Sequence, residues 1–205
     1  MYPSIKNFCE QLVTHFDEIS VERKELLEKV SAFITKKKAA GLDIKLVYIC
    51  THNSRRSHFG QVWANVAADF FHVENVSTFS GGTKATAFNP NAINALRRVG
   101  FDIFTIEEGS NPIYRVAHSD TYAPSICFSK VYDDDANPQA GYAAIMTCSD
   151  AEENCPFIPG VELRIGTTYD DPKAFDNTPQ QDTKYDERCR QIALETFYVF
   201  FLARH

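Results

Sequence analysis

A strand-like run of apolar residues ends at a cysteine, and an amphipathic helix begins a few residues later. The run is KLVYIC, residues 45–50, and the connecting segment THNSRRS covers residues 51–57. The helix is indicated by apolar residues at helical spacing, namely Phe59, Val62, Trp63, Val66 and Phe70. This order puts Cys50 at the carboxyl end of a buried strand, where open α/β sheets carry their sites.

The alternation of strands and helices continues along the chain. A helix is predicted with Asn89 at its N-cap, Pro90 at its first position and Gly100 past its end, and another from about Asp182 onward. Three further strands are expected from the runs VSTFSGG, AAIMTC and VELRIGTTY, at residues 76–82, 143–148 and 161–169. Together these elements indicate an α/β fold around a mainly parallel sheet.

Two regions lie outside this alternation. Residues 4–40 predict two helices, with Phe8, Leu12, Phe16 and Ile19 on the first and Ser20 as N-cap of the second. The lysines at positions 36–38 are interpreted as a C-terminal cap of that second helix rather than as a binding patch. Residues 107–140 contain prolines and an acidic run and predict a long excursion, in which SICFSKVY is a candidate strand.

Composition limits the classes of partner. The net charge of -6 and the pI near 5.5 argue against a nucleic-acid-binding protein, but a small anion needs only a local cluster of donors. No apolar stretch approaches the roughly 18 residues of a membrane span, and the N-terminus does not resemble a signal peptide. We therefore expect a cytoplasmic protein without a membrane partner.

Six cysteines in a chain of this length are too few for a secreted disulfide scaffold. Cys9, Cys127 and Cys189 are expected to be small buried residues of the core. Cys148 and Cys155 lie in MTCSDAEENCP, whose spacing does not match the usual zinc ligands, and no metal or cofactor is predicted. Two readings of this pair remain: structural cysteines, or thiols that act in series with Cys50 in a redox relay.

The segment from Cys50 to Ser57 suits a thiolate and a tetrahedral oxyanion together. Backbone N–H groups of a tight loop, with those of the helix N-terminus, can point inward and favour both negative charges. Arg56 supplies a planar fork for two oxygens, and the Ser57 hydroxyl can bond the sulfur or cap the helix. The residues of the loop between Cys50 and Arg56 are also expected to bind the anion, namely Thr51, His52, Asn53, Ser54 and Arg55.

This C-x5-R-S segment resembles the phosphate-binding loop of the low-molecular-weight protein tyrosine phosphatases and of the thioredoxin-coupled arsenate reductases. The resemblance implies a central parallel sheet of about four strands flanked by helices, in a domain of residues 45–205 that follows a helical extension of residues 1–44. Two departures stand out: His52 replaces a usual glycine, and Arg55 stands where many members have a second cysteine. His52 either stabilises the anion or faces solvent.

The segment from Cys148 to Pro156 resembles the one that carries the second and third redox cysteines of the arsenate reductases, which the phosphatases do not share. The resemblance therefore implies a relay of Cys50, Cys148 and Cys155 that reduces arsenate with electrons from a thioredoxin-like partner. Ser80 and Asn53 match positions that bind potassium in some of the reductases, but Gln61 replaces the expected glutamate, so no cation site is predicted.

Asp170 and Asp171 precede Pro172, and a carboxylic acid near the anion site can protonate a leaving oxygen. Adjacent residues of an extended segment point opposite ways, so only one should reach the site, and the family pattern indicates Asp171. The aromatic residues that usually follow in tyrosine phosphatases are missing, since Lys173 comes next. Arsenate reductase is the preferred interpretation, tyrosine phosphatase the alternative, and a non-catalytic oxyanion or redox sensor the third.

Overall fold

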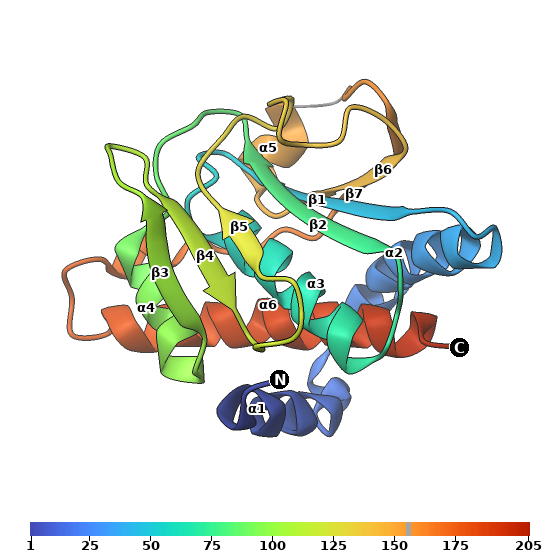
Figure 1. Cartoon of the computed structure of the whole chain (residues 1–205), viewed down its shortest axis with the longest axis horizontal. Coiled ribbons are helices and arrows are strands. Elements are labelled where there is room, and N and C mark those ends of the chain that lie inside the picture. The colour runs from blue at the N-terminus through green and yellow to red at the C-terminus, as the bar shows by residue number, and fades with distance from the viewer. Residues whose placement is uncertain (155–156) are drawn as a thin grey trace.

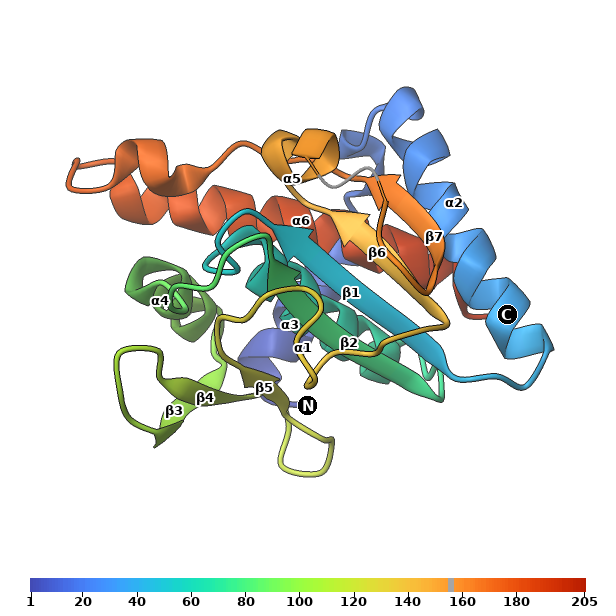
Figure 2. The same cartoon turned by 90° about the horizontal axis from the view of Figure 1, so that it is seen from above.

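The computed structural model describes residues 1–154 and 157–205, without the side chain of Asn154. Its centre is a four-stranded parallel sheet in the order β2-β1-β6-β7, which Figure 2 shows from above. The strands are β1 (Ile44–Cys50), β2 (Val76–Gly82), β6 (Tyr142–Met146) and β7 (Val161–Gly166). The predicted α/β fold with a parallel sheet of about four strands is confirmed.

The sheet is covered on both faces, as parallel sheets require. Successive residues of β1 point to opposite faces, so that Leu46 and Tyr48 belong to the larger core while Val47 and Ile49 belong to the smaller one. The larger core is built with α3 (Arg56–Phe70) and α6 (Gln181–Ala203), which lie together beneath the sheet in Figure 1. The smaller core, on the other face, includes Ala151 of α5 (Ser149–Asn154).

Helix α3 approaches the sheet closely at Gly60. A Cβ atom at this position would lie 2.2 Å from the ring of Tyr48, closer than real atoms come. Glycine therefore allows α3 to lie against β1 directly after the loop that joins them. This close contact fixes the start of the helix relative to the end of the strand.

The region 102–140 contains more strands than the one candidate expected within the excursion of residues 107–140. It forms an antiparallel sheet in the order β3-β4-β5, comprising β3 (Asp102–Glu107), β4 (Ile113–Ala117) and β5 (Ser125–Cys127). Strand β3 lacks the usual alternation of apolar and polar residues, because apolar residues occupy both of its faces. Ile103 is buried, whereas Phe104 and Ile106 on the other face are exposed. The segment that follows β5 reaches the first sheet at an isolated bridge between Gly82 of β2 and Val131.

The N-terminal helices pack onto the same core as the rest of the chain. They are α1 (Pro3–Val13), the 3-10 turn η1 (Phe16–Glu18) and α2 (Val21–Ala39), and they contact α6. Ser20 caps α2 as predicted, with its hydroxyl accepting from the backbone N–H of Arg23 at 3.2 Å. The first helix is shorter than predicted, because the side chains of Thr14 and His15 both bond the Gln11 carbonyl and end α1 before Phe16.

The remaining elements follow the sequence closely. Helix α4 (Pro90–Val99) begins at an Asn89 cap and ends at Gly100, whose φ of 118° suits glycine. A second 3-10 turn, η2 (Pro172–Phe175), precedes α6. Cys9, Cys127 and Cys189 are buried as expected. In the part of the chain that the structure describes, no helix combines the length and apolar character needed to cross a bilayer.

The buried His58 of α3 makes the free energy of unfolding depend on pH. Its ring is fully enclosed, packs on Phe88 at 4.1 Å and lies 3.2 Å from the Ser80 hydroxyl. Burial first, and then the charge of Lys130, lower the pKa of His58 from 6.5 to about 3. Between these values the unfolded chain binds a proton that the native protein does not, so stability falls as the pH falls.

We predict that His58→Asn reduces the acid sensitivity of folding. From pH 6.5 to pH 5 the wild-type protein should lose about 2 kcal/mol of unfolding free energy through this histidine, and the variant should not. Urea unfolding at the two pH values measures the difference. His72→Asn, at an exposed histidine, is the control and should keep the wild-type slope. Equal slopes for all three proteins would contradict the prediction.

Candidate active site

Cys50 is the last residue of β1, and α3 begins six residues later at Arg56. The thiol is buried, with only 3% of the residue exposed, and its Sγ lies 3.1 Å from the Ser57 hydroxyl. Ser57 belongs to the first turn of α3, where backbone N–H groups are free of intrahelical partners. The thiol therefore faces the amino-terminal end of a helix, as the sequence predicts.

Asn53 holds the loop in shape. It adopts a positive φ of 43°, a conformation that asparagine tolerates better than most residues, and it is fully buried. Its side-chain amide donates to the Ser57 hydroxyl at 2.9 Å and accepts from the backbone N–H of Lys130 at 2.9 Å. The left-handed conformation falls on Asn53 and not on His52, the residue that replaces the usual glycine, and His52 itself is exposed.

The carbonyl groups of the loop bond to the surrounding chain. The Thr51 carbonyl accepts from Lys84, that of His52 from the Ser129 hydroxyl, and that of Ser54 from Asn89, at distances of 2.8 to 2.9 Å. Among the described residues, no backbone N–H from His52 to Arg55 has a hydrogen-bond partner. With the carbonyl groups engaged elsewhere, these N–H groups are left available to an anion.

Arg56 is held by the segment before η2. Its Nη1 donates to the Tyr169 carbonyl at 2.7 Å and its Nη2 to the Asp171 carboxylate at 2.8 Å. The guanidinium Nε is buried and has no partner among the described residues. A planar fork thus has its orientation set by the protein while one donor remains for a ligand.

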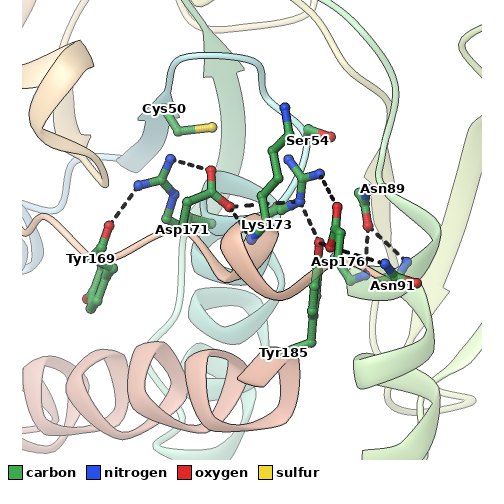
Figure 3. A network of polar contacts seen from close by, with 12 residues as sticks. Cys50, Ser54, Asn89, Asn91, Tyr169, Asp171, Lys173, Asp176 and Tyr185 are labelled. Atoms are coloured by element: carbon green, nitrogen blue, oxygen red, sulfur yellow. Dashed lines mark hydrogen bonds and ion pairs between the residues drawn. The ribbon is translucent and has the colours of Figure 1, made fainter. Parts of the chain in front are cut away.

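Asp171 and Asp170 point in different directions, as expected for neighbours in an extended segment. The Asp171 side chain is 31% exposed, pairs with Arg56 and accepts from the backbone N–H of Lys173 at 3.0 Å. The side chain of Asp170 is 98% exposed and lies 3.4 Å from Arg188. In Figure 3 the Asp171 carboxylate lies on the side of Cys50, and Lys173 extends from η2 towards the loop.

Arg55 makes contacts that the sequence did not indicate. Its Nε donates to the Tyr185 hydroxyl at 2.7 Å, and its Nη2 lies 3.4 Å from Asp176. Tyr185 also donates to Asp176 at 2.7 Å, and burial raises the pKa of this phenol. Figure 3 shows Tyr185 and Asp176 together. Arg55 therefore ties the loop to η2 and α6, and its role as an anion ligand remains a prediction.

Cys148 lies beside the loop, two residues after the end of the neighbouring strand β6. Strands β1 and β6 pair in parallel with Ile49 opposite Met146, so both cysteines follow at the same edge of the sheet. The Thr51 hydroxyl lies 3.4 Å from the Cys148 Sγ and donates to Asp150 at 2.7 Å. Cys148 is 2% exposed and belongs to the same apolar cluster as Cys50. Cys155 lies outside the described residues.

The side chains at the positions that match potassium ligands in some reductases have hydrogen-bond partners within the protein. The Ser80 hydroxyl donates to the Gln61 side chain at 2.7 Å, and the Asn53 side chain is engaged as described above. Within the described ranges, no cluster of three or more histidine, cysteine or acidic side chains is arranged to hold a metal.

Tyr169, Tyr185 and Asp176 were missed as site residues by sequence reasoning. Each acts by holding an arginine of the loop from more than a hundred residues away in the chain. Their only local signal is proximity to Asp171, since all three fall within fifteen residues of it.

Comparison with solved structures defines the class of protein. The fold matches a low-molecular-weight phosphotyrosine phosphatase from Vibrio cholerae O395, with a TM-score of 0.50, 13% identity and coverage of 76% of this chain and 93% of that chain. A mutant of YwlE from Bacillus subtilis matches with a TM-score of 0.50, 12% identity and coverage of 78% and 97%. The chain has the low-molecular-weight phosphatase fold.

Comparison of sequences adds the family. Arsenate reductase 2 of Staphylococcus epidermidis is 32% identical over 133 residues, covering 64% of this chain and 81% of that protein. Arsenate reductase of Bacillus subtilis is 27% identical over 150 residues, covering 73% and 89%. No family model matches the chain. The chain belongs to the family of arsenate reductases that share the low-molecular-weight phosphatase fold, a family of enzymes.

We predict that Cys50 is alkylated before the buried core cysteines. Burial raises the pKa of Cys127 and of Cys189 to about 12 and raises that of Cys9 as well, so these thiols should be unreactive at neutral pH. Inorganic phosphate should slow the Cys50 reaction alone. Iodoacetamide labelling followed by peptide mass spectrometry measures both effects, and an unprotected Cys50 would overturn the anion-site interpretation.

The two arginines of the loop should differ in their sensitivity to substitution. Arg56→Lys keeps the charge but loses the planar fork, so kcat should fall by about 100-fold or more while the fold survives. Arg55→Lys, the matched control, should cost less because Arg55 bonds Tyr185 and Asp176. Steady-state kinetics and thermal unfolding compare the two variants. A larger loss of kcat in Arg55→Lys than in Arg56→Lys would mean that Arg55, and not Arg56, binds the anion.

Proposed function

We propose that the protein is a thioredoxin-coupled arsenate reductase with Cys50 as nucleophile. The observation that carries this proposal is the second thiol: Cys148 lies at the same sheet edge as Cys50 and contacts Thr51 of the loop. A hydrolytic phosphatase has no use for a thiol at this point, because water resolves its phosphocysteine intermediate. A reductase needs a second thiol to take the place of the arsenic on Cys50.

In the first step the Cys50 thiolate attacks arsenic. The oxyanion is held by the free N–H groups of the loop and by the Arg56 Nε, which supplies charge-assisted hydrogen bonds. A sulfur–arsenic bond forms, and an arsenic–oxygen bond breaks with its electron pair on oxygen. Asp171, which lies beside Arg56, protonates that oxygen so that it leaves as water.

In the second step the Cys148 thiolate attacks the Cys50 sulfur. A disulfide forms, and the electron pair of the sulfur–arsenic bond passes to arsenic, which is reduced to arsenite. The Cys155 thiolate then attacks the Cys148 sulfur and releases the Cys50 thiolate. The Cys148–Cys155 disulfide is finally reduced by an external dithiol of the thioredoxin class, which supplies the two electrons.

A tyrosine phosphatase is the second candidate, since Cys50, Arg56 and Asp171 also suffice for ester cleavage. The segment after Asp171 favours the reductase over this candidate. A phenyl ring of a phosphotyrosine would be expected to pack on aromatic side chains there, but Lys173 follows Pro172 and extends towards the loop in Figure 3. A cation at this point suits a small, highly charged oxyanion better than an aryl ester.

The decisive experiment replaces Cys155 with Ser. A single turnover with arsenate should still release arsenite and should accumulate the Cys50–Cys148 disulfide, because the first two thiols complete the reduction. Multiple turnovers with a thioredoxin system should stop. Hydrolysis of p-nitrophenyl phosphate should be nearly unchanged, since that reaction does not use Cys155.

Cys9→Ala, at a buried cysteine of α1, is the matched control and should keep full turnover. Peptide mapping after arsenate exposure identifies the disulfide. If Cys148 and Cys155 stay reduced and Cys155→Ser turns over normally, the reductase proposal is wrong and ester hydrolysis replaces it. Activity towards neither substrate would instead favour an oxyanion sensor.

A further inference from the structure

A carboxylate buried in α6 links the N-terminal extension to the active site. Glu195 is only 4% exposed, and three polar atoms lie within 2.8 Å of its Oε2 atom. Two of them belong to Arg23 of α2: its Nε donates a hydrogen bond at 2.8 Å, and its Nη2 makes an ion-pair contact at 2.7 Å. The third is the Tyr169 hydroxyl, which donates a hydrogen bond at 2.8 Å. The Glu195 Oε2 atom thus connects Arg23 of the N-terminal extension to Tyr169, which lies two residues before Asp171.

Tyr169 is held on two sides. Its ring is buried, with 8% of the residue exposed, and the Arg23 guanidinium lies 4.8 Å from the ring centre. A cation over an aromatic face is attracted to the ring, and this attraction adds to the shared bond with Glu195. Burial raises the pKa of Tyr169 well above its usual value, so the hydroxyl stays protonated and remains a donor.

The backbone of Tyr169 reaches the catalytic arginine. Its carbonyl accepts from the Arg56 Nη1 at 2.7 Å, and Asp171, two residues further on, accepts from Nη2 of the same guanidinium at 2.8 Å. Figure 3 shows Tyr169 and Asp171 on the same side of the site. The position of Tyr169 therefore sets both the plane of the Arg56 fork and the place of the acid.

We propose that Arg23 is a positioning residue of the active site, which fixes Arg56 and Asp171 through Glu195 and Tyr169. This inference rests on the proposed function only in that Arg56 and Asp171 serve the chemistry; it holds for arsenate reduction and for ester hydrolysis alike. It gives the extension a task at the site, although no residue of α1 or α2 contacts the Cys50 loop through a hydrogen bond in the described chain.

An anchoring role for Arg23 is the competing explanation, and a second ion pair separates the two. Arg190 of α6 makes a bidentate pair with Glu18 of η1, at 2.7 and 2.9 Å, so it also ties the extension to α6. Neither residue has a hydrogen bond to Tyr169, Asp171 or Arg56 in the described chain. Glu18→Gln therefore weakens the attachment of the extension and leaves the path to Arg56 intact.

The experiment compares Arg23→Met with Glu18→Gln in the full-length protein. For Arg23→Met we expect kcat to fall about tenfold for both arsenate and p-nitrophenyl phosphate, because small displacements of catalytic groups are costly. The phosphate concentration that half-protects Cys50 from iodoacetamide should rise severalfold, as Arg56 loses its fixed orientation. Glu18→Gln should change neither quantity by more than about twofold, and Arg23→Lys should recover part of the loss.

Tyr169→Phe provides a second test that leaves Arg23 in place. It removes only the hydroxyl that bonds Glu195, and its effect on kcat should resemble that of Arg23→Met. The double variant should be no slower than the slower single one, because residues that act through one chain of contacts are not additive. Additive losses, or equal losses in Arg23→Met and Glu18→Gln, would overturn the proposal.

The measurement of phosphate protection tests the role of Arg23 independently of whether the protein reduces arsenate. If the protein reduces no arsenate but Arg23→Met weakens phosphate protection, the positioning role stands and the reductase assignment falls. If Arg23→Met does not fold, Tyr169→Phe decides the question by the same two readouts. Unchanged protection and unchanged kcat in Tyr169→Phe would then reject the role.

Discussion

The shape of the active-site loop depends on Asn53. Its buried amide bonds the Ser57 hydroxyl at the start of α3 and the backbone of Lys130 in the segment that leaves the second sheet. Gly82 packs against the same turn, where an added Cβ would lie 2.7 Å from the Asn53 backbone nitrogen. These contacts restrain the loop, so that its N–H groups are oriented towards an anion by the protein itself.

The site joins three distant parts of the chain at the two arginines of the loop. Arg56 is bonded by residues that precede η2, and Arg55 by residues that follow it, so η2 is fastened to the loop on both sides. Asp171 is itself one of these attachments, and its Oδ1 also lies 3.8 Å from the Arg55 Nε. An acid in this position is kept near the thiol by geometry rather than by its own contacts with the nucleophile, and its distance from the reacting atoms depends on both arginines.

Local patterns of sequence were sufficient for the central sheet and for the ends of several helices. The cap at Asn89, the stop at Gly100 and the strand that ends at Cys50 are signals of a few adjacent residues. The β3-β4-β5 sheet was not predicted, because β3 exposes Phe104 and Ile106 and so lacks a clean alternation. The bonds of Arg56 to Tyr169 and of Arg55 to Tyr185 span more than a hundred residues, and no local pattern encodes them.

The Arg23–Glu195 pair shows why a buried ion pair is informative about position. Removing two charges from water costs free energy that their attraction barely repays, and apolar side chains of similar volume often stabilise a fold as well. Such a pair contributes orientation. Two nitrogens of Arg23 and the hydroxyl of Tyr169 contact the same oxygen of Glu195, and these contacts restrict the position of the Tyr169 ring. A contact that only held α2 against α6 would not require three groups to meet at one oxygen. The accurate placement of the Tyr169 carbonyl does require it.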